Sequence, residues 1–149
     1  MSGEDLKPWE RPIESAEEFK AGNDAVIAEF RANGGRVGGD YEGSDLMLLT
    51  TTGARTGRSH TVALGYQAQG ARLIVSSLVE TAYPAWYHNL RAKPGVTVEV
   101  GTETFSATAT VATGEERERL WEWMIQAWPW VADHQQTTKL QIPIVILER

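Results

Sequence analysis

The chain of 149 residues contains no cysteine. Disulfides, thiolate nucleophiles and cysteine-ligated metal sites are therefore excluded, and we expect a reducing compartment, the cytoplasm. No apolar run approaches the length of a membrane span, so no transmembrane segment is expected. The N-terminal sequence MSGEDLKPWERP is polar and acidic, unlike a secretory signal.

Basic residues are also scarce, because 14 Lys and Arg stand against 20 Asp and Glu and give a net charge of −6. This balance argues against nucleic acid as a partner. The sequence has no Gly-x-Ser-x-Gly nucleophile elbow. Its three histidines are scattered singly, so we expect no bound metal. Neither a serine hydrolase nor a metalloenzyme is indicated.

The sequence is rich in short β-strand patterns that are joined by tight turns. They predict an α+β fold with a mostly antiparallel, curled sheet and flanking helices. An irregular leader is expected at residues 1–14, and a single domain at residues 15–149. The predicted hairpins cover residues 46–66 and 96–111, with further strands at 73–77 and 142–147. The predicted helices cover residues 15–33, 84–93 and 113–128, and an irregular polar stretch is expected after Pro129.

The tip of the first hairpin concentrates groups that bind anions. Gly53 and Gly57 bracket the turn, since glycine adopts a positive φ without steric cost. Between and after them stand two guanidiniums, two hydroxyls and an imidazole: Arg55, Thr56, Arg58, Ser59 and His60. These side chains and the accessible backbone N–H groups could form a nest for an anion. A solvated hairpin tip is the alternative interpretation.

Several motifs occur in an order that resembles one known family. The segments LLTTTGARTG, PAWYHNLRAKPGVTVEV and IPIVIL resemble the deazaflavin (coenzyme F420)-dependent nitroreductases. Those proteins are small split β-barrels, similar to FMN-binding proteins, and they use reduced coenzyme F420. The resemblance implies an F420H2-dependent oxidoreductase that transfers a hydride to a small electron-poor acceptor. The acceptor would be a quinone, a nitroaromatic compound or a conjugated carbonyl.

The resemblance also implies which residues bind the cofactor. The hairpin tip would hold the phosphate and the polyglutamate tail through Ala54, Arg55, Thr56, Arg58, Ser59 and His60. Thr61, Val62 and Ala63 would lie against the ring system, with their backbone groups addressing its polar edge. Ser76 and Ser77 would close the pocket. The W-Y-x-N-L helix would contribute Ala85, Trp86, Tyr87, His88 and Asn89, because a helix N-terminus attracts anions.

The same resemblance predicts a substrate lid formed by Tyr83, Trp130, Val131 and His134. Val131 is small where the family often has a bulky residue, so a roomier mouth is expected. Tyr66 and His134 are the predicted catalytic residues, as proton donors to the reduced substrate. The alternative for His134 is a structural role at a surface turn. The turn at residues 78–83 departs from the family pattern and adds Glu80.

The sequence is also compatible with two other functions. The chain could be a split barrel that uses FMN as its cofactor, or a binder of a cofactor or small ligand without turnover of its own. A homodimer that pairs through the barrel wall is a further expectation.

Overall fold

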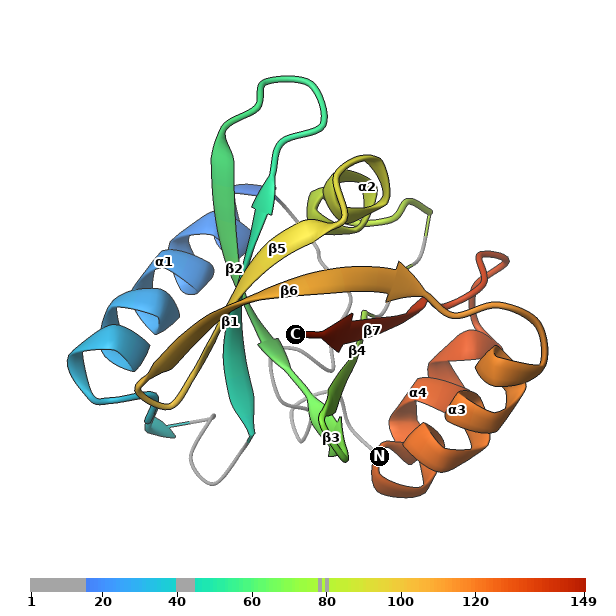
Figure 1. Cartoon of the computed structure of the whole chain (residues 1–149). Coiled ribbons are helices and arrows are strands. Elements are labelled where there is room, and N and C mark those ends of the chain that lie inside the picture. The colour runs from blue at the N-terminus through green and yellow to red at the C-terminus, as the bar shows by residue number, and fades with distance from the viewer. Residues whose placement is uncertain (1–15, 40–44, 78, 80) are drawn as a thin grey trace.

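In the computed structural model, seven strands of the described residues form one antiparallel sheet in the order β2-β1-β5-β6-β7-β4-β3 (Figure 1). The structure describes residues 16–39, 45–77, 79 and 81–149, with side chains from Asn23 onward. The predicted leader and Glu80 lie outside this part. The strands are β1 Leu46–Thr52, β2 Ser59–Gly65, β3 Gln67–Gln69, β4 Arg72–Ser76, β5 Gly95–Val100, β6 Glu103–Val111 and β7 Ile144–Glu148. Both predicted hairpins are confirmed by the β1–β2 and β5–β6 pairings.

The sheet curls until its two edges approach each other. Strands β2 and β3 are the outermost strands in the hydrogen-bonding order, yet only Tyr66 separates them in the sequence. The chain can pass from one edge to the other in one residue only if the sheet is rolled up, and β2 does contact β4. The Tyr66 N–H donates to the Asp45 carbonyl at 3.2 Å near this closure. The predicted curled antiparallel sheet is confirmed.

The apolar runs at the start of β1, residues 46–49, and over most of β7, residues 144–147, are buried on both faces of the sheet. In β1, Met47 and Leu49 face the inner core, whereas Leu48 packs in a cluster with helix α1, Ala16–Ala32. In β7, Val145 faces the inner core and Ile146 packs in the cluster beneath the C-terminal helices. Alternate side chains of one strand thus serve two separate cores.

The described residues include four helices beside the sheet, with α1 on one side and the C-terminal helices on the other (Figure 1). They include α2, Ala85–Ala92, and α3, Gly114–Ala127. The fourth, α4, Pro129–Gln135, occupies the stretch that the sequence predicts to be irregular. That prediction is wrong because Pro129 stands at the start of the helix, where its missing N–H needs no partner. No helix in the described part of the chain is long and apolar enough to cross a bilayer.

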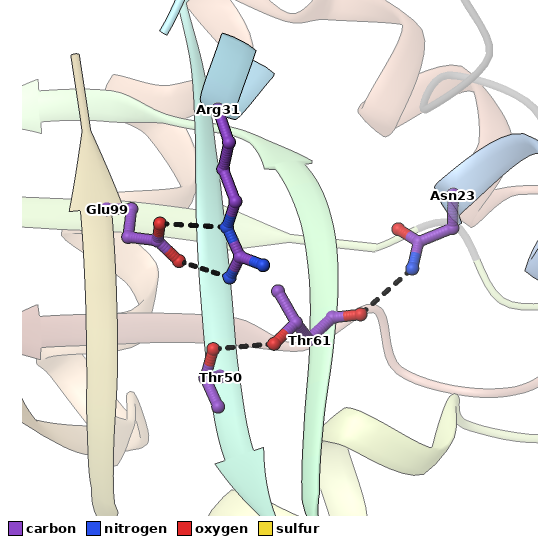
Figure 2. Close-up of polar contacts among 5 residues, drawn as sticks. All are labelled: Asn23, Arg31, Thr50, Thr61 and Glu99. Carbon is purple, nitrogen blue, oxygen red and sulfur yellow. Dashed lines mark hydrogen bonds and ion pairs between the residues drawn. The ribbon is translucent and has the colours of Figure 1, made fainter. Parts of the chain in front are cut away.

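Polar contacts fasten α1 to the first strands of the sheet (Figure 2). The Arg31 guanidinium donates two hydrogen bonds, at 3.1 and 2.9 Å, to the Glu99 carboxylate on β5. The Asn23 side-chain Nδ2 donates to the Thr61 carbonyl of β2 at 2.9 Å. Thr61 also shares a hydroxyl hydrogen bond of 2.7 Å with Thr50 of β1. Helix α1 is therefore fixed to β2 and β5 at separate points.

Candidate functional site

The tip between β1 and β2 has a defined backbone shape. The Gly53 N–H donates to the Arg58 carbonyl at 2.7 Å, and the Gly57 N–H donates to the Gly53 carbonyl at 3.0 Å. Gly57 has a φ of +71°, which favours glycine. The Thr56 hydroxyl accepts from the Arg58 N–H at 3.2 Å. The loop is thus closed by its own hydrogen bonds, and they do not involve the ends of the two arginine side chains.

The predicted anion-binding side chains lie together on this tip and face solvent. Ala54, Arg55, Thr56, Arg58, Ser59 and His60 are all exposed. Within the described residues, neither Arg55 nor Arg58 forms an ion pair. Two guanidiniums without carboxylate partners therefore stand on one loop of an acidic chain. Such a pair can bind phosphate or carboxylate groups in the bidentate manner typical of arginine.

Helix α2 supports the tip from below. The Asn89 side chain is 8% exposed. Its Oδ1 accepts from the Ala54 N–H at 3.1 Å, and its Nδ2 donates to the Thr51 hydroxyl at 3.2 Å. The Lys93 ammonium donates to the Gly53 carbonyl at 3.4 Å. Asn89, predicted to contact the cofactor, has its hydrogen-bonding groups committed to the protein, and it positions the tip.

The other predicted residues of α2 divide between core and surface. Trp86 and Tyr87 are 3% and 7% exposed and belong to the inner core. Ala85 and His88 are exposed. The packed aromatic rings explain why this short helix sits firmly against the barrel, whereas the two exposed positions are open to a ligand.

The polar backbone groups predicted to face the cofactor ring already have a protein partner. The Asn23 side chain accepts from the Ala63 N–H at 2.8 Å, as well as donating to the Thr61 carbonyl. Its amide therefore pairs with the free edge of β2 as a neighbouring strand would, which protects that edge. Val62 between them is buried. Sequence reasoning missed Asn23; the signal for it was an asparagine inside an amphipathic helix, where this residue is unfavourable.

The end of β4 lies against the residues that precede β7. The Ser76 hydroxyl donates to the Pro143 carbonyl at 2.6 Å, and Ser77 is half-buried beside it in the chain. The predicted pocket-closing serines are thus brought to the junction of β4 and β7. The Ser76 hydroxyl serves to hold this junction together.

An aromatic cluster lies where the chain enters α2. The ring centroid of Tyr83 is 4.7 Å from that of Tyr87 and 6.2 Å from that of His88. The Arg91 guanidinium lies 5.6 Å from the Tyr87 ring. The Tyr83 hydroxyl donates to the Gln141 carbonyl at 2.9 Å. Tyr83, a predicted lid residue, therefore connects α2 with the segment that leads into β7.

The remaining predicted lid residues lie on α4 in different environments. Val131 is 1% exposed and packs in the core beneath α3 and α4, so its side chain does not face an opening. Trp130 is half-buried and its ring lies 5.6 Å from that of Trp128. The His134 Nε2 donates to the Val79 carbonyl at 2.7 Å. This bond gives His134 a structural contact, as in the alternative interpretation of that residue.

The second predicted proton donor, Tyr66, lies at the closure of the barrel and packs against the inner core. Burial raises the pKa of its phenol above the ordinary value, and the nearby Asp45 carboxylate raises it further. The phenol therefore keeps its proton at neutral pH. Among the residues the structure describes, no group of three His, Asp or Glu side chains is arranged to hold a metal ion.

Comparison with known proteins identifies the family of this chain. Residues 24–149 match the family described as F420H(2)-dependent quinone reductase. The chain belongs to this family. Its members are oxidoreductases that use reduced coenzyme F420, which confirms the cofactor and enzyme class that the resemblance implies. The F420H(2)-dependent quinone reductase Rv1261c of Mycobacterium tuberculosis is 36% identical over 128 residues, which cover 82% of this chain and 86% of that protein.

Solved structures confirm the split β-barrel. A structure titled F420-H2 Dependent Reductase (FDR-A) has 32% identity and a TM-score of 0.62, covering 70% of this chain and 94% of its own. A structure described as a domain-swapped dimer has 29% identity and a TM-score of 0.66, covering 90% and 100%. HutZ, the heme storage protein from Vibrio cholerae, shares the fold at 17% identity and a TM-score of 0.51, covering 84% of this chain and 88% of its own.

Proposed function

We propose that this protein transfers a hydride from reduced coenzyme F420 to a quinone. A curated relative with 36% identity is named as a quinone reductase of this kind. Nitroaromatic compounds and conjugated carbonyls belong to the same electron-poor class and are proposed as additional acceptors. The protein places the two reactants, and the cofactor when bound supplies the hydride chemistry.

The hairpin tip carries this proposal. The cofactor has a phosphate and a polyglutamate tail, and the tip offers two exposed guanidiniums without ion-pair partners in the described residues. Arg55 and Arg58 would bind the anionic groups, with the Thr56 and Ser59 hydroxyls as additional donors. The tip is preorganised, because Asn89 ties its backbone to α2. A preorganised anion site loses less entropy on binding than a mobile loop.

We further propose that Tyr66, rather than His134, is the protein group that supplies the proton for quinone reduction. The Tyr66 phenol has no hydrogen-bond partner among the described residues, and the raised pKa keeps it protonated. The Nε2 proton of His134 is engaged with the Val79 carbonyl. A group already committed to a backbone acceptor is the poorer donor.

A paired titration tests the choice of cofactor. The pure protein is titrated with oxidised coenzyme F420 and with FMN at low salt, with binding followed by cofactor fluorescence. We expect the protein to bind F420 tightly and FMN weakly or not at all. The affinity for F420 should fall at least tenfold in the variant with both Arg55→Gln and Arg58→Gln. Its matched control is Arg119→Gln, a change at another exposed arginine. Binding of FMN in preference to F420 would overturn the proposal. Unchanged F420 affinity in the double variant would show that the phosphate and tail of the cofactor do not bind at the hairpin tip.

We also propose that two copies of the chain associate. The relative that is 29% identical is described as a domain-swapped dimer and covers 90% of this chain. In this chain α1 packs on β1 through an apolar cluster and pairs with β5 through Arg31 and Glu99. An α1 from a second copy could make the same contacts. Light scattering at micromolar concentration should report a dimer, and a monomer at that concentration would contradict the proposal.

A further inference from the structure

A groove lies between α3 and the segment that connects α4 with β7. Its volume is about 560 Å³, which is within the range of small-molecule sites. Its walls combine one aromatic ring with cationic, anionic and amide side chains, contributed by Arg117, Glu118, Trp121, Glu122, Gln135, Lys139 and Gln141. None of these residues belongs to the site assigned above.

Arg117 is the unusual member of this set. Its side chain is half-buried, and the guanidinium lies 5.4 Å from the Trp121 ring centroid. Two other arginines near it are neutralised, since Arg119 pairs with Glu115 on α3 and Arg72 pairs with Glu116. Arg117 forms no ion pair within the described residues. A half-buried cation without a counter-charge is a ready partner for an anionic ligand.

Arg117 keeps its positive charge in these surroundings. Burial lowers the pKa of the guanidinium from its ordinary value, while the neighbouring Tyr83 and Tyr87 hydroxyls raise it. The group stays charged at neutral pH because arginine is protonated far above that range. The lining carboxylates of Glu118 and Glu122 are exposed, so water and salt screen their repulsion of a bound anion.

Tyr83 connects the groove with helix α2 of the candidate cofactor site. The Tyr83 hydroxyl donates to the carbonyl of the groove residue Gln141, and its ring packs on Tyr87 of α2. Helix α2 in turn holds the hairpin tip through Asn89. Tyr83 therefore links a groove residue to the helix that positions the cofactor-binding loop.

We propose that this groove binds the acceptor, and that it selects flat aromatic acceptors bearing an anionic substituent. The ring would pack against Trp121, and the carboxylate or enolate oxygen would accept hydrogen bonds from Arg117. Lys139 at the rim adds a second positive charge. This inference rests on the proposed quinone reductase function and names the substrate class for it.

The test compares an acid with its neutral amide. Anthraquinone-2-carboxylate and anthraquinone-2-carboxamide share one ring system and differ in one charge. Their binding to the protein without cofactor is measured by equilibrium dialysis. We expect the wild-type protein to bind the acid at least tenfold more tightly than the amide. Arg117→Gln should abolish that preference, Arg117→Lys should retain part of it, and Arg119→Gln should leave it unchanged.

Turnover separates this inference from the proposed function. With reduced coenzyme F420, the ratio of kcat/KM for the acid to that for the amide should fall at least tenfold in Arg117→Gln. Arg119→Gln, a change outside the groove, should leave this ratio within twofold of the wild-type value. If both quinones are reduced and Arg117→Gln changes neither the binding preference nor this ratio, the inference is wrong and the proposed function stands. If the protein reduces neither quinone with the reduced cofactor, the proposed function fails and the acceptor role fails with it.

Discussion

Removing the Asn89 side chain should weaken both the fold and the hairpin tip. In Asn89→Ala the Thr51 hydroxyl, which is 1% exposed, loses its hydrogen-bond donor in a buried place. An unsatisfied buried polar group costs about 1–3 kcal/mol. The Ala54 N–H loses its acceptor as well, but water can replace that bond at an exposed residue, so the loss is about 0.5–1 kcal/mol. We expect the free energy of unfolding to fall by about 1.5–4 kcal/mol in total.

Urea denaturation measures this loss, and a double-mutant cycle assigns it. Thr51→Val removes the buried hydroxyl, so Asn89→Ala should cost about 1–2 kcal/mol less in that background than in the wild type. Hydrogen exchange at the Ala54 amide should accelerate in Asn89→Ala, because the tip is no longer tied to α2. Asn33→Ala is the matched control, since Asn33 makes only a local bond to the Glu29 carbonyl on exposed helix surface.

A free energy of unfolding for Asn89→Ala within about 0.5 kcal/mol of the wild-type value would refute the reasoning, because changes at uninvolved surface residues have effects of that size. So would strict additivity with Thr51→Val. Coenzyme F420 provides a second readout. If Asn89 positions the tip, Asn89→Ala should weaken cofactor binding and leave its salt dependence unchanged, since the charges of Arg55 and Arg58 stay in place.

Three further substitutions give separate predictions. Asn23→Ala should lower the free energy of unfolding by about 1–2 kcal/mol and speed hydrogen exchange at the Ala63 amide; unchanged exchange would show that the β2 edge is protected otherwise. Because the Tyr66 pKa is raised in the folded state, stability should decline as pH rises above about 10, where the unfolded chain loses its proton first. In Tyr66→Phe, urea unfolding between pH 9 and 11 should show a smaller decline in stability than in the wild type. An identical decline in both proteins would contradict this role of Tyr66. His134→Phe should lose about 1 kcal/mol of stability through the broken bond to Val79, with the pH profile of quinone reduction unaltered; an altered profile would restore His134 as the donor.

Local patterns allowed much of the fold to be predicted. The β1–β2 hairpin follows from an apolar run, bracketing glycines and a second β pattern, all within 21 residues of sequence (46–66). The exposed guanidiniums of Arg55 and Arg58 follow from the same local logic, because a hairpin tip faces solvent. Pro129 shows the limit of such signals: a proline ends one helix and begins the next, and the sequence does not distinguish these roles.

Contacts between residues that are far apart in the chain could not be predicted from the sequence. The closure of the barrel at Tyr66 depends on the order of all seven strands, which no short pattern encodes. The hydrogen bonds of Asn23 to β2 and of Asn89 to Thr51 span 38 to 40 positions. Their geometry exists only once the helices have packed. For the same reason the burial of Val131, predicted as a lid residue, depends on how α4 docks on the core.

Anaerobic mixing of the pure protein with reduced coenzyme F420 and menadione tests the central claim most directly. The absorbance of oxidised F420 follows the reaction. We expect one molecule of oxidised F420 to appear for each molecule of quinone consumed, at a rate proportional to protein concentration. The rate should fall at least tenfold in the variant with both Arg55→Gln and Arg58→Gln when the cofactor is below saturation. Oxidation no faster than in the protein-free mixture, at a protein concentration where F420 binding is demonstrated, would contradict the assignment as a quinone reductase.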